Sequence, residues 1–431
     1  MNRCPIVAMH CPWIRIPLIV AGCLRLLPSA SLPAQETQTI PLRSSITAVQ
    51  PMTGIVLWSD NDSVGMHADA ITLEYRYCGY DEIVKSDGRY DWSAIDRLLD
   101  EIAGRNHQAI LRFYFCYVGK KTTVPEFIRS RSDYEETVGK SERKTTHFCD
   151  WSNEALQEFT LDFYTQFAKR YDQDPRIAYL QTGFGLWAEY HIYSGPRKMG
   201  ETFPSKAFQV RFLKHLDQQF ESLPWSISVD AADYDYTPLE DNDELLALSF
   251  GVFDDSFLCK QHAKENAVNW NILDRSRWKR QPGGGEFSYY NNRDQTNALA
   301  INGPNGVSFE EAARDFHITY MIGNDQTRHS TIQRIRQAGM ASGYRFRVTE
   351  AKVKSGDLHL TVANEGVAPI YRDAFFAAGD KRSPSSLKGL LPGESLDCVI
   401  SSVSDQDLKR ISIESDAILP TQQIQFLANL E

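Results

Sequence analysis

Short apolar segments typical of β-strands alternate with segments of helical periodicity throughout residues 53–339. In residues 71–77, for example, Leu73, Tyr75 and Tyr77 share one face of a strand. Strands joined by helical crossovers form parallel sheets. The expected strands are 54–58, 71–77, 108–115, 177–182, 225–230, 245–253, a segment ending near the glycines at 283–285, and 318–322. Eight such strands predict an α/β fold, the (β/α)8 TIM barrel.

The pattern changes near residue 344. Five strand-like segments follow, separated by turn signals and without helical periodicity. We therefore expect a barrel over residues 50–343 and a small all-β sandwich of immunoglobulin-like type over 344–431. The long segment 117–149 falls between the third strand and the next helix, and is interpreted as a solvated excursion or as a lid over the strand ends.

The amino terminus is typical of an export signal. Arg3 and Arg15 precede an apolar core at 16–22, and small residues near Ala30 and Ala34 offer cleavage sites. We expect residues 1–34 to be a signal peptide cleaved after Ala34, which would make the protein periplasmic or secreted. The alternative is a lipid anchor at Cys23, because residues 20–23 resemble a lipobox.

Five cysteines lie beyond this segment, without the spacing of a metal site: Cys78, Cys116, Cys149, Cys259 and Cys398. Export permits a disulfide. Cys78 and Cys116 each follow an expected strand and could pair, but buried free thiols are an equally good interpretation.

The composition excludes several classes of function. The formal charge of −10 argues against non-specific binding to nucleic acids or anionic membranes. No later stretch reaches the roughly 18 apolar residues that span a bilayer. Fingerprints for phosphate, dinucleotide or zinc binding are absent from the sequence, so we predict no cofactor and no metal.

Two acidic residues are the candidate catalytic groups. Glu189 follows the fourth expected strand and is surrounded by Trp187, Tyr190 and His191, and Glu286 follows the glycine run where the seventh strand should end. The carboxyl ends of barrel strands carry the chemistry in such folds. Glycosidic cleavage needs one protonated carboxyl and one ionised carboxyl. The alternatives are a solvated loop acid for Glu189 and an ordinary flexible loop around Glu286.

Other side chains at the expected strand ends are candidates for substrate binding. Aromatic rings there stack on sugars, although each one alone is more often core or rim. Acids and amides bind sugar hydroxyls or a cation such as calcium, although most act as helix caps or turn formers. The predicted substrate-binding residues are Trp58, Arg76, Arg112, Tyr114, Trp187, Tyr190, His191, Asp230, Asp254, Tyr289 and Asn324, and Tyr290, Asp233, Asp235, Asp255 and Asp325 lie beside them.

Charged residues also occur inside the expected strands. Glu74, Arg76 and Arg112 lie opposite the apolar faces of their strands. Because charge inside a barrel must be paired, we expect these three to form a network in the barrel interior. The network would be either a structural ion pair or a device that keeps a nearby carboxylate ionised.

The motifs LEYRY at 73–77, GLWAEYH at 185–191, QPGGGEFS at 281–288 and GYRFRV at 343–348, together with residues 90–115, resemble a family of exported bacterial proteins with a domain of unknown function. That family is similar to clan A, the retaining glycoside hydrolases built on (β/α)8 barrels. The resemblance implies that Glu189 is the acid/base and Glu286 the nucleophile. The chain differs from the clan at Ala188, where an asparagine usually precedes the acid/base.

We therefore predict an exported protein that cleaves a poly- or oligosaccharide by a two-carboxylate retaining mechanism. The alternative from another class is a non-catalytic carbohydrate-binding barrel of the cell envelope. A third hypothesis is a structural envelope protein whose β-domain mediates contacts. In the first two cases the partner is a carbohydrate and not a nucleic acid.

Overall fold

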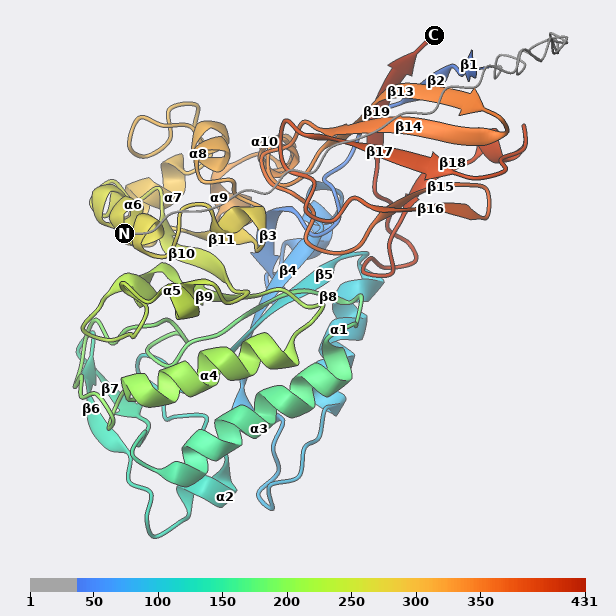
Figure 1. Cartoon of the computed structure of the whole chain (residues 1–431). Helices are drawn as coiled ribbons and strands as arrows, with labels where there is room; N and C mark the ends of the chain where they lie inside the picture. Colours follow the sequence, from blue (N-terminus) through green and yellow to red (C-terminus); the bar gives the residue numbers. More distant parts are fainter. Residues whose placement is uncertain (1–36) are drawn as a thin grey trace, which may run out of the picture. The chain divides into compact units, whose positions relative to one another are not determined.

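The computed structural model of the protein describes residues 37–431, so the predicted signal peptide and the Cys23 anchor lie outside the described residues. Eight parallel strands close into a barrel (Figure 1). They are β3 (Gly54–Trp58), β4 (Leu73–Gly79), β5 (Gln108–Tyr114), β8 (Ile177–Gln181), β9 (Trp225–Ser228), β10 (Gly251–Phe257), β11 (Gly283–Phe287) and β12 (Tyr320–Ile322). The predicted TIM-like barrel is confirmed.

Helices connect these strands. Five of them match expected segments: α1 (Ser93–Gly104), α3 (Glu154–Tyr171), α4 (Lys206–Gln219), α8 (Phe309–Asp315) and α10 (Ile332–Met340). The sequence did not predict α2 (Glu126–Arg129), α5 (Asp243–Leu246), α6 (Ala263–Ile272), α7 (Asn292–Asn297) or α9 (Gln326–His329). Short 3-10 helices complete the set: η1 (Val64–Ala70), η2 (Tyr80–Glu82), η3 (Val229–Ala232), η4 (Arg277–Lys279) and η5 (Asp407–Lys409).

The sixth barrel strand begins later than predicted. The Asn242 side chain accepts a hydrogen bond from the Leu245 backbone N–H at 3.2 Å, which caps α5 where a strand was expected. Strand β10 then begins at Gly251 and continues to Phe257. This shift places Asp254 and Asp255 inside the strand instead of after it.

The excursion between β5 and α3 contains regular structure. Besides α2, it forms a hairpin of β6 (Thr137–Ser141) and β7 (Lys144–Phe148). The backbone of the hairpin is paired residue by residue, from Thr137 with Phe148 to Ser141 with Lys144. The excursion is therefore a folded wall beside the barrel and not an irregular loop.

Aromatic and polar side chains fill the barrel interior in layers. Near its floor the rings of Tyr179 and Tyr320 stack with centroids 4.9 Å apart. Above them, Gln181 Nε2 donates to Tyr320 Oη at 2.7 Å, and Arg112 Nε donates to Gln181 Oε1 at 2.8 Å. Gly284 makes room for this packing, because a Cβ there would lie 2.4 Å from the Tyr320 ring. The interior is a packed core that becomes polar toward the carboxyl ends of the strands.

Two sheets follow the barrel, as predicted for a β-sandwich, and their strands pair antiparallel except for the parallel pair β13 and β19. One contains β13 (Phe346–Lys354), β14 (Asp357–Asn364), β17 (Ser395–Ile400) and β19 (Phe426–Leu430), extended by β1 (Thr37–Thr39) and β2 (Leu42–Ser44). The other contains β15 (Phe375–Ala378), β16 (Lys381–Ser386) and β18 (Ile411–Glu414). The rings of Phe376 and Phe426 meet between the sheets at 5.2 Å.

The β-domain contacts the barrel at the amino ends of its strands. Gln108, the first residue of β5, donates from Nε2 to the Ala417 carbonyl at 2.8 Å. The carboxyl ends of the strands lie at the opposite end of the barrel. No helix among the described residues is long and apolar enough to cross a membrane.

Candidate active site

Glu189 lies in a tight loop that follows β8. The loop closes on itself through hydrogen bonds from Gly185 N to Glu189 O at 2.8 Å and from Glu189 N to Leu186 O at 3.0 Å. Trp187 and Ala188 both have positive φ angles, of 61° and 55°. Two consecutive left-handed residues reverse the chain direction, so the backbone fixes the position of the Glu189 carboxyl.

Glycine is required where this loop turns back. A Cβ on Gly183 would lie 2.3 Å from the Ala188 carbonyl oxygen, and one on Gly185 would lie 1.8 Å from the His191 carbonyl oxygen. No side chain fits at either distance. The two glycines that interrupt the strand pattern in the sequence therefore allow the acidic loop to fold against the strand end.

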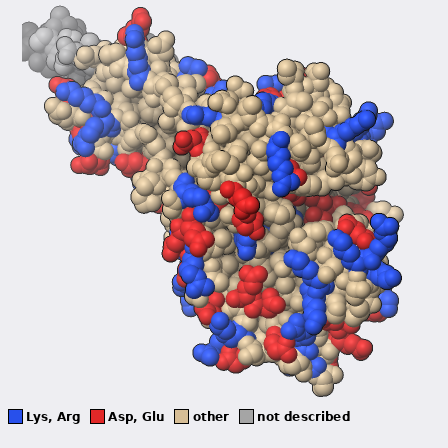
Figure 2. All heavy atoms as spheres, turned by 180° about the vertical axis from the view of Figure 1, so that it is seen from behind, with Lys and Arg blue, Asp and Glu red and all other residues tan. Residues whose placement is uncertain are grey.

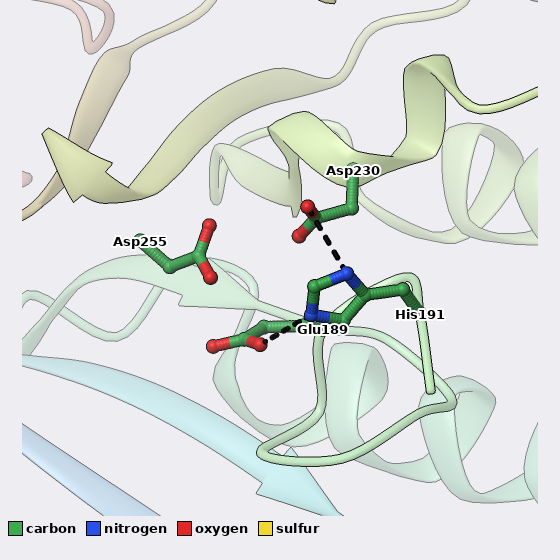
Figure 3. A group of neighbouring side chains, drawn as sticks. All are labelled: Glu189, His191, Asp230 and Asp255. Carbon is green, nitrogen blue, oxygen red and sulfur yellow. Dashed lines mark hydrogen bonds and ion pairs between the residues drawn. The ribbon is translucent and has the colours of Figure 1, made fainter. Parts of the chain in front are cut away.

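His191 joins Glu189 to Asp230, as Figure 3 shows. His191 Nε2 lies 3.2 Å from Glu189 Oε2, and His191 Nδ1 lies 3.2 Å from Asp230 Oδ1. Asp230 belongs to η3, and its second oxygen accepts a hydrogen bond from Ser228 Oγ at 2.9 Å. Asp255 of β10 faces the same three side chains (Figure 3). One imidazole thus lies among three carboxyl groups.

Burial and crowded negative charge determine the protonation of this cluster. Burial, reinforced by Asp255, raises the pKa of Glu189 to about 8, although His191 opposes the shift. Burial lowers the pKa of His191, but Asp230 and Glu189 outweigh it and raise that pKa to about 10. Burial and Asp255 also raise the pKa of Asp230, to about 6. At neutral pH the cluster therefore combines a protonated Glu189 with a His191 imidazolium.

The same four side chains are close enough to hold a cation. One ligand atom from each of Glu189, His191, Asp230 and Asp255 lies within 4.8 Å of the others. However, each nitrogen of His191 already faces a carboxyl oxygen at 3.2 Å. A metal ion would have to displace one of these contacts, and the imidazolium already supplies a positive charge.

Arg112 connects Glu189 to the barrel interior. Its side chain is 1% exposed, and its Nη1 lies 3.8 Å from Glu189 Oε1. The same nitrogen donates to Tyr77 Oη at 3.1 Å and to the Trp187 carbonyl at 3.2 Å. The guanidinium lies over the Phe253 ring at 4.1 Å. These contacts fix a positive charge beneath the site.

Glu286 lies inside β11, with the glycines 283–285 forming the first part of that strand. The expectation that the glycine run ends the strand or forms a flexible loop is wrong. Gly285 is required here, because a Cβ would lie 2.2 Å from the Asp254 carbonyl oxygen of β10. The glycines let β10 and β11 approach closely, and the first side chain that projects after them is Glu286.

The Glu286 carboxyl shares neighbours with Glu189. Burial raises the pKa of Glu286 to about 8, and Arg112 and Trp58 oppose the shift. Burial raises the pKa of the Tyr77 phenol, and the negative charges of Glu286 and Glu189 raise it further. Glu286 Oε1 is buried without a hydrogen-bond partner among the described residues. Glu286 lies two residues after Gly284, whose Cβ position faces the Tyr320 ring, so its side chain is on the interior face of β11. Glu189 lies 3.8 Å from the interior guanidinium of Arg112.

A row of aromatic rings lines this end of the barrel. Tyr77 packs edge-on against Trp58 at 6.2 Å and against Tyr117 at 5.9 Å. Tyr117 packs against Trp187 at 4.1 Å, and Tyr114 lies 5.4 Å from Tyr117. Trp58, Tyr114 and Trp187 of the predicted set are thus brought together. Faces and edges of such rings are what sugar-binding sites use.

Tyr289 and Asn324 lie on the Glu286 side. Tyr289 is 48% exposed, and Glu286 and Asp325 add to the effect of burial in raising its pKa. Asn324 Oδ1 accepts hydrogen bonds from the Trp58 backbone N–H at 3.1 Å and from Asn61 Nδ2 at 2.7 Å. Asn324 therefore holds the end of β3 in place, whereas Tyr289 is free to meet a ligand.

Three predicted residues do not reach the site. Tyr190 is fully buried and packs against Phe184 at 5.3 Å, because the reversal at Trp187 and Ala188 turns it into the core. Asp254 accepts hydrogen bonds from Asn266 Nδ2 at 2.8 Å and Trp270 Nε1 at 3.1 Å of α6, outside the barrel. Arg76 forms an ion pair with Asp60 at 2.8 Å and faces away from the interior.

The predicted interior network of Glu74, Arg76 and Arg112 is wrong. Glu74 accepts from Arg105 Nη2 at 2.6 Å and lies 2.7 Å from His107 Nδ1, outside the barrel wall. The alternation along β4 was read correctly, but Tyr75 and Tyr77 occupy the interior face instead of the charged residues. Only Arg112 of the three is in the interior.

Three residues beside the site were not predicted: Tyr77, Tyr117 and Gln181. Asp255 was placed beside the predicted substrate-binding residues but not among them. Tyr77 could have been predicted from the alternation along β4, because it shares a face with Leu73 and Tyr75. In the β4–β5 register it pairs with Arg112. For Asp255 the sequence gives no such indication, because Asp254 and Asp255 are consecutive and either one could face inward. Gln181 lies within an apolar strand segment, and nothing in the sequence indicates that its side chain faces the barrel interior.

Charge on the surface is mixed. Figure 2 shows basic and acidic side chains interspersed over the back of the molecule, with a group of acidic side chains set into a hollow near the right-hand edge. That face has no continuous basic patch among the described residues. Such a patch is what backbone contacts to nucleic acids require.

The chain matches no protein-family model, and no curated protein matches it. It is similar to the solved structure of a glycoside hydrolase with 13% identity, covering 63% of this chain and 88% of that chain with a TM-score of 0.39. It is also similar to endo-glycoceramidase II from Rhodococcus sp. with 9% identity. That match covers 83% of this chain and 100% of that chain, with a TM-score of 0.43. A third similar structure is that of a GH30 endoxylanase from Clostridium papyrosolvens C71, with 9% identity. That match covers 91% of this chain and 97% of that chain, with a TM-score of 0.39.

Proposed function

We propose that the protein is a glycoside hydrolase that cleaves an O-glycosidic bond in a poly- or oligosaccharide, with Glu189 as general acid/base and Glu286 as nucleophile. The observation that carries this proposal is the position of the two carboxyls around the buried Arg112. Glu189 follows β8, and its Oε1 lies 3.8 Å from Arg112 Nη1. Glu286 lies in β11, and the charge of Arg112 lowers its pKa. The proposal rests on this geometry and on the aromatic row beside it.

Glu189 is suited to donate the first proton. Burial and Asp255 keep its pKa at about 8, so it carries a proton at neutral pH. The proton passes from the Glu189 carboxyl to the leaving glycosidic oxygen. As the Glu189 carboxylate forms, the His191 imidazolium 3.2 Å away stabilises the new negative charge. The carboxylate then accepts a proton from the water that completes the reaction.

Glu286 attacks the anomeric carbon in its ionised form. The Arg112 guanidinium and the Trp58 indole lower its pKa, whereas burial, Asp255 and Asp325 raise it. The net value of about 8 means that only part of the protein has an ionised nucleophile at neutral pH. We therefore propose that Arg112, by lowering the pKa of Glu286, sets the fraction of the protein in which Glu286 is ionised at neutral pH.

A second candidate function is carbohydrate binding without hydrolysis. Two observations favour it: Glu286 has a raised pKa, and Ala188 stands before the proposed acid/base. With both carboxyls protonated, the site would offer hydrogen bonds and aromatic faces to a sugar but no nucleophile.

One experiment separates the two functions. The protein and a Glu286→Gln variant are incubated with a polysaccharide panel, and released sugars and bound polysaccharide are both measured at pH 6, 7 and 8. Hydrolysis predicts sugar release by the unmodified protein only, with polysaccharide bound by both. Binding without release by either protein supports the second function. The anomer formed first, followed by NMR, then tests the mechanism: retention fits Glu286 as nucleophile, and inversion assigns it as a base.

We also propose that the protein is exported and that residues 50–343 and 344–431 are separate domains. The support for export is the signal-like sequence of residues 1–34. Determination of the mature amino terminus tests it: a terminus at Gln35 indicates cleavage after Ala34, and a lipid-modified Cys23 indicates an anchored protein.

A further inference from the structure

Two cysteines meet beside the active-site loop. Cys116 follows β5 and Cys149 follows β7, and their Sγ atoms lie 3.6 Å apart. Both side chains are fully buried. The sequence left open a Cys78–Cys116 pair or buried free thiols, and in the structure the folded excursion places Cys149 beside Cys116.

The Cys116 end of this contact is attached to the loop that carries Glu189. The Cys116 carbonyl accepts a hydrogen bond from the Trp187 N–H at 3.1 Å, and Cys116 forms a β-bridge with Leu186. The next residue, Tyr117, packs its ring 4.1 Å from that of Trp187. Cys149 directly follows Phe148, the last residue of the β6–β7 hairpin. A bond between the two sulfurs would fasten the hairpin to the strand end that supports Trp187.

We propose that Cys116 and Cys149 form a disulfide when the protein folds in an oxidising compartment, and that this bond tethers the excursion 117–149 to the active-site wall. The separation of 3.6 Å must shorten to about 2 Å, which a small rotation of two neighbouring side chains provides. The bond closes a loop across 33 residues of sequence separation.

The reaction needs an external disulfide as oxidant, such as oxidised glutathione. One cysteine thiolate attacks a sulfur of that disulfide and releases one thiol, giving a mixed disulfide. The second cysteine attacks the protein-bound sulfur and releases the second thiol. One Cys116–Cys149 bond replaces the bond of the oxidant, and the two S–H protons end on the two released thiols.

The burial of the pair determines when the bond forms. Burial and the nearby Cys116 raise the pKa of the Cys149 thiol well above its ordinary value, and neither sulfur is accessible in the folded protein. An oxidant therefore reaches the thiols before the excursion packs against the barrel. Once the protein has folded with both thiols reduced, we expect it to resist oxidation.

Refolding with and without oxidant tests the proposal. The full chain is denatured under reducing conditions, refolded in a glutathione redox buffer or in reductant alone, and then denatured and alkylated before peptide mapping. The expected result is a linked Cys116–Cys149 peptide only in the oxidised sample. Cys78, Cys259 and Cys398 should be alkylated in both samples and serve as internal controls. Full alkylation of Cys116 and Cys149 in the oxidised sample would overturn the proposal.

Two variants separate this pair from the alternative. Cys78→Ala should leave the linked peptide intact, and Cys149→Ala should leave Cys116 alkylated. A Cys78–Cys116 peptide in the unmodified protein would overturn the assignment. For the tethering role, trypsin should cut the excursion severalfold faster in the protein refolded without oxidant. Equal cleavage rates would contradict that role while leaving the hydrolase proposal untouched.

Discussion

Asp254 and Asp255 are consecutive residues of β10, yet their carboxyls lie on opposite sides of the barrel wall. Asp254 accepts a hydrogen bond from Trp270 Nε1 of α6 at 3.1 Å, whereas Asp255 faces Glu189, His191 and Asp230 inside the site. Side chains alternate along a strand, so only one of two neighbouring acids can reach the interior. This arrangement provides a matched pair of residues for experiments on the site.

The first prediction concerns the pH dependence of hydrolysis. Activity requires ionised Glu286 and protonated Glu189, both with a pKa of about 8, so kcat/KM should be bell-shaped and centred near pH 8. Asp255 raises the pKa of both acids. Asp255→Asn should therefore move both limbs to lower pH, by about 0.5 to 1 unit.

The neighbouring Asp254→Asn variant is the control for this shift. It should lose about 1 kcal/mol of unfolding free energy, because a buried acceptor of hydrogen bonds from α6 is changed, and it should keep the unmodified profile. Identical profiles for Asp255→Asn and the unmodified protein would contradict the placement of Asp255. An unmodified optimum below pH 5 would contradict the raised pKa values.

The second prediction concerns His191. As a cation, His191 lowers the pKa of Glu189, so His191→Gln should raise that pKa and move the alkaline limb of kcat/KM to higher pH. The acid limb reports Glu286, whose pKa is set mainly by burial, Arg112 and Asp255, and should stay in place. A uniform loss of kcat without any change in the profile would indicate a purely structural role.

The third prediction is that removing a catalytic charge stabilises the protein. Because the pKa of Glu286 is raised in the folded state, its contribution to stability is full below its ordinary pKa, near 4.5, and declines as pH rises through about 8. Glu286→Gln should match the unmodified protein at about pH 3.5 and exceed it at pH 9, by about 1 to 3 kcal/mol. Thermal unfolding at the two pH values measures this. The exposed Glu265→Gln on α6 is the control and should show no such difference.

The fourth prediction concerns metal ions. Both nitrogens of His191 face carboxyl groups, and Glu189 must carry a proton to act as an acid. We therefore expect EDTA to leave hydrolysis unchanged, and millimolar Zn²⁺ to inhibit by displacing that proton. His191→Gln should weaken the inhibition. Activity that EDTA abolishes and a divalent cation restores would instead make the cluster a metal site.

The barrel could be predicted from sequence, because strand and helix periodicities are local properties. The orientation of its strands could not. Both faces of a barrel strand are buried, so the alternation along β4 does not indicate whether Glu74 or Tyr75 faces inward. Arg105 and His107 settle this by pairing with Glu74 outside the barrel, which leaves the interior to the tyrosines.

The candidate site was predictable in outline for a similar reason. Glu189 was identified from its place after an apolar strand and Glu286 from its place after the glycines. Tyr190 was misplaced because the left-handed conformations of Trp187 and Ala188 have no sequence signature. The sequence does not indicate that Asp255 rather than Asp254 faces the site, because β10 extends from Gly251 to Phe257 and contains both acids, whereas the apolar pattern placed them after the strand.

The roles of the two carboxyls can be measured through the leaving group. Aryl glycosides of a sugar chosen by the polysaccharide panel, with phenols of pKa from about 4 to about 10, are compared by kcat/KM. Glu189→Gln should lose little on the most acidic phenol and about 10²- to 10⁴-fold on the least acidic, because only the latter needs a proton donor. Glu286→Gln should lose activity on every substrate, and Glu265→Gln should lose none. Equal losses of Glu189→Gln across the series, or full activity of Glu286→Gln, would contradict the assignment of acid and nucleophile.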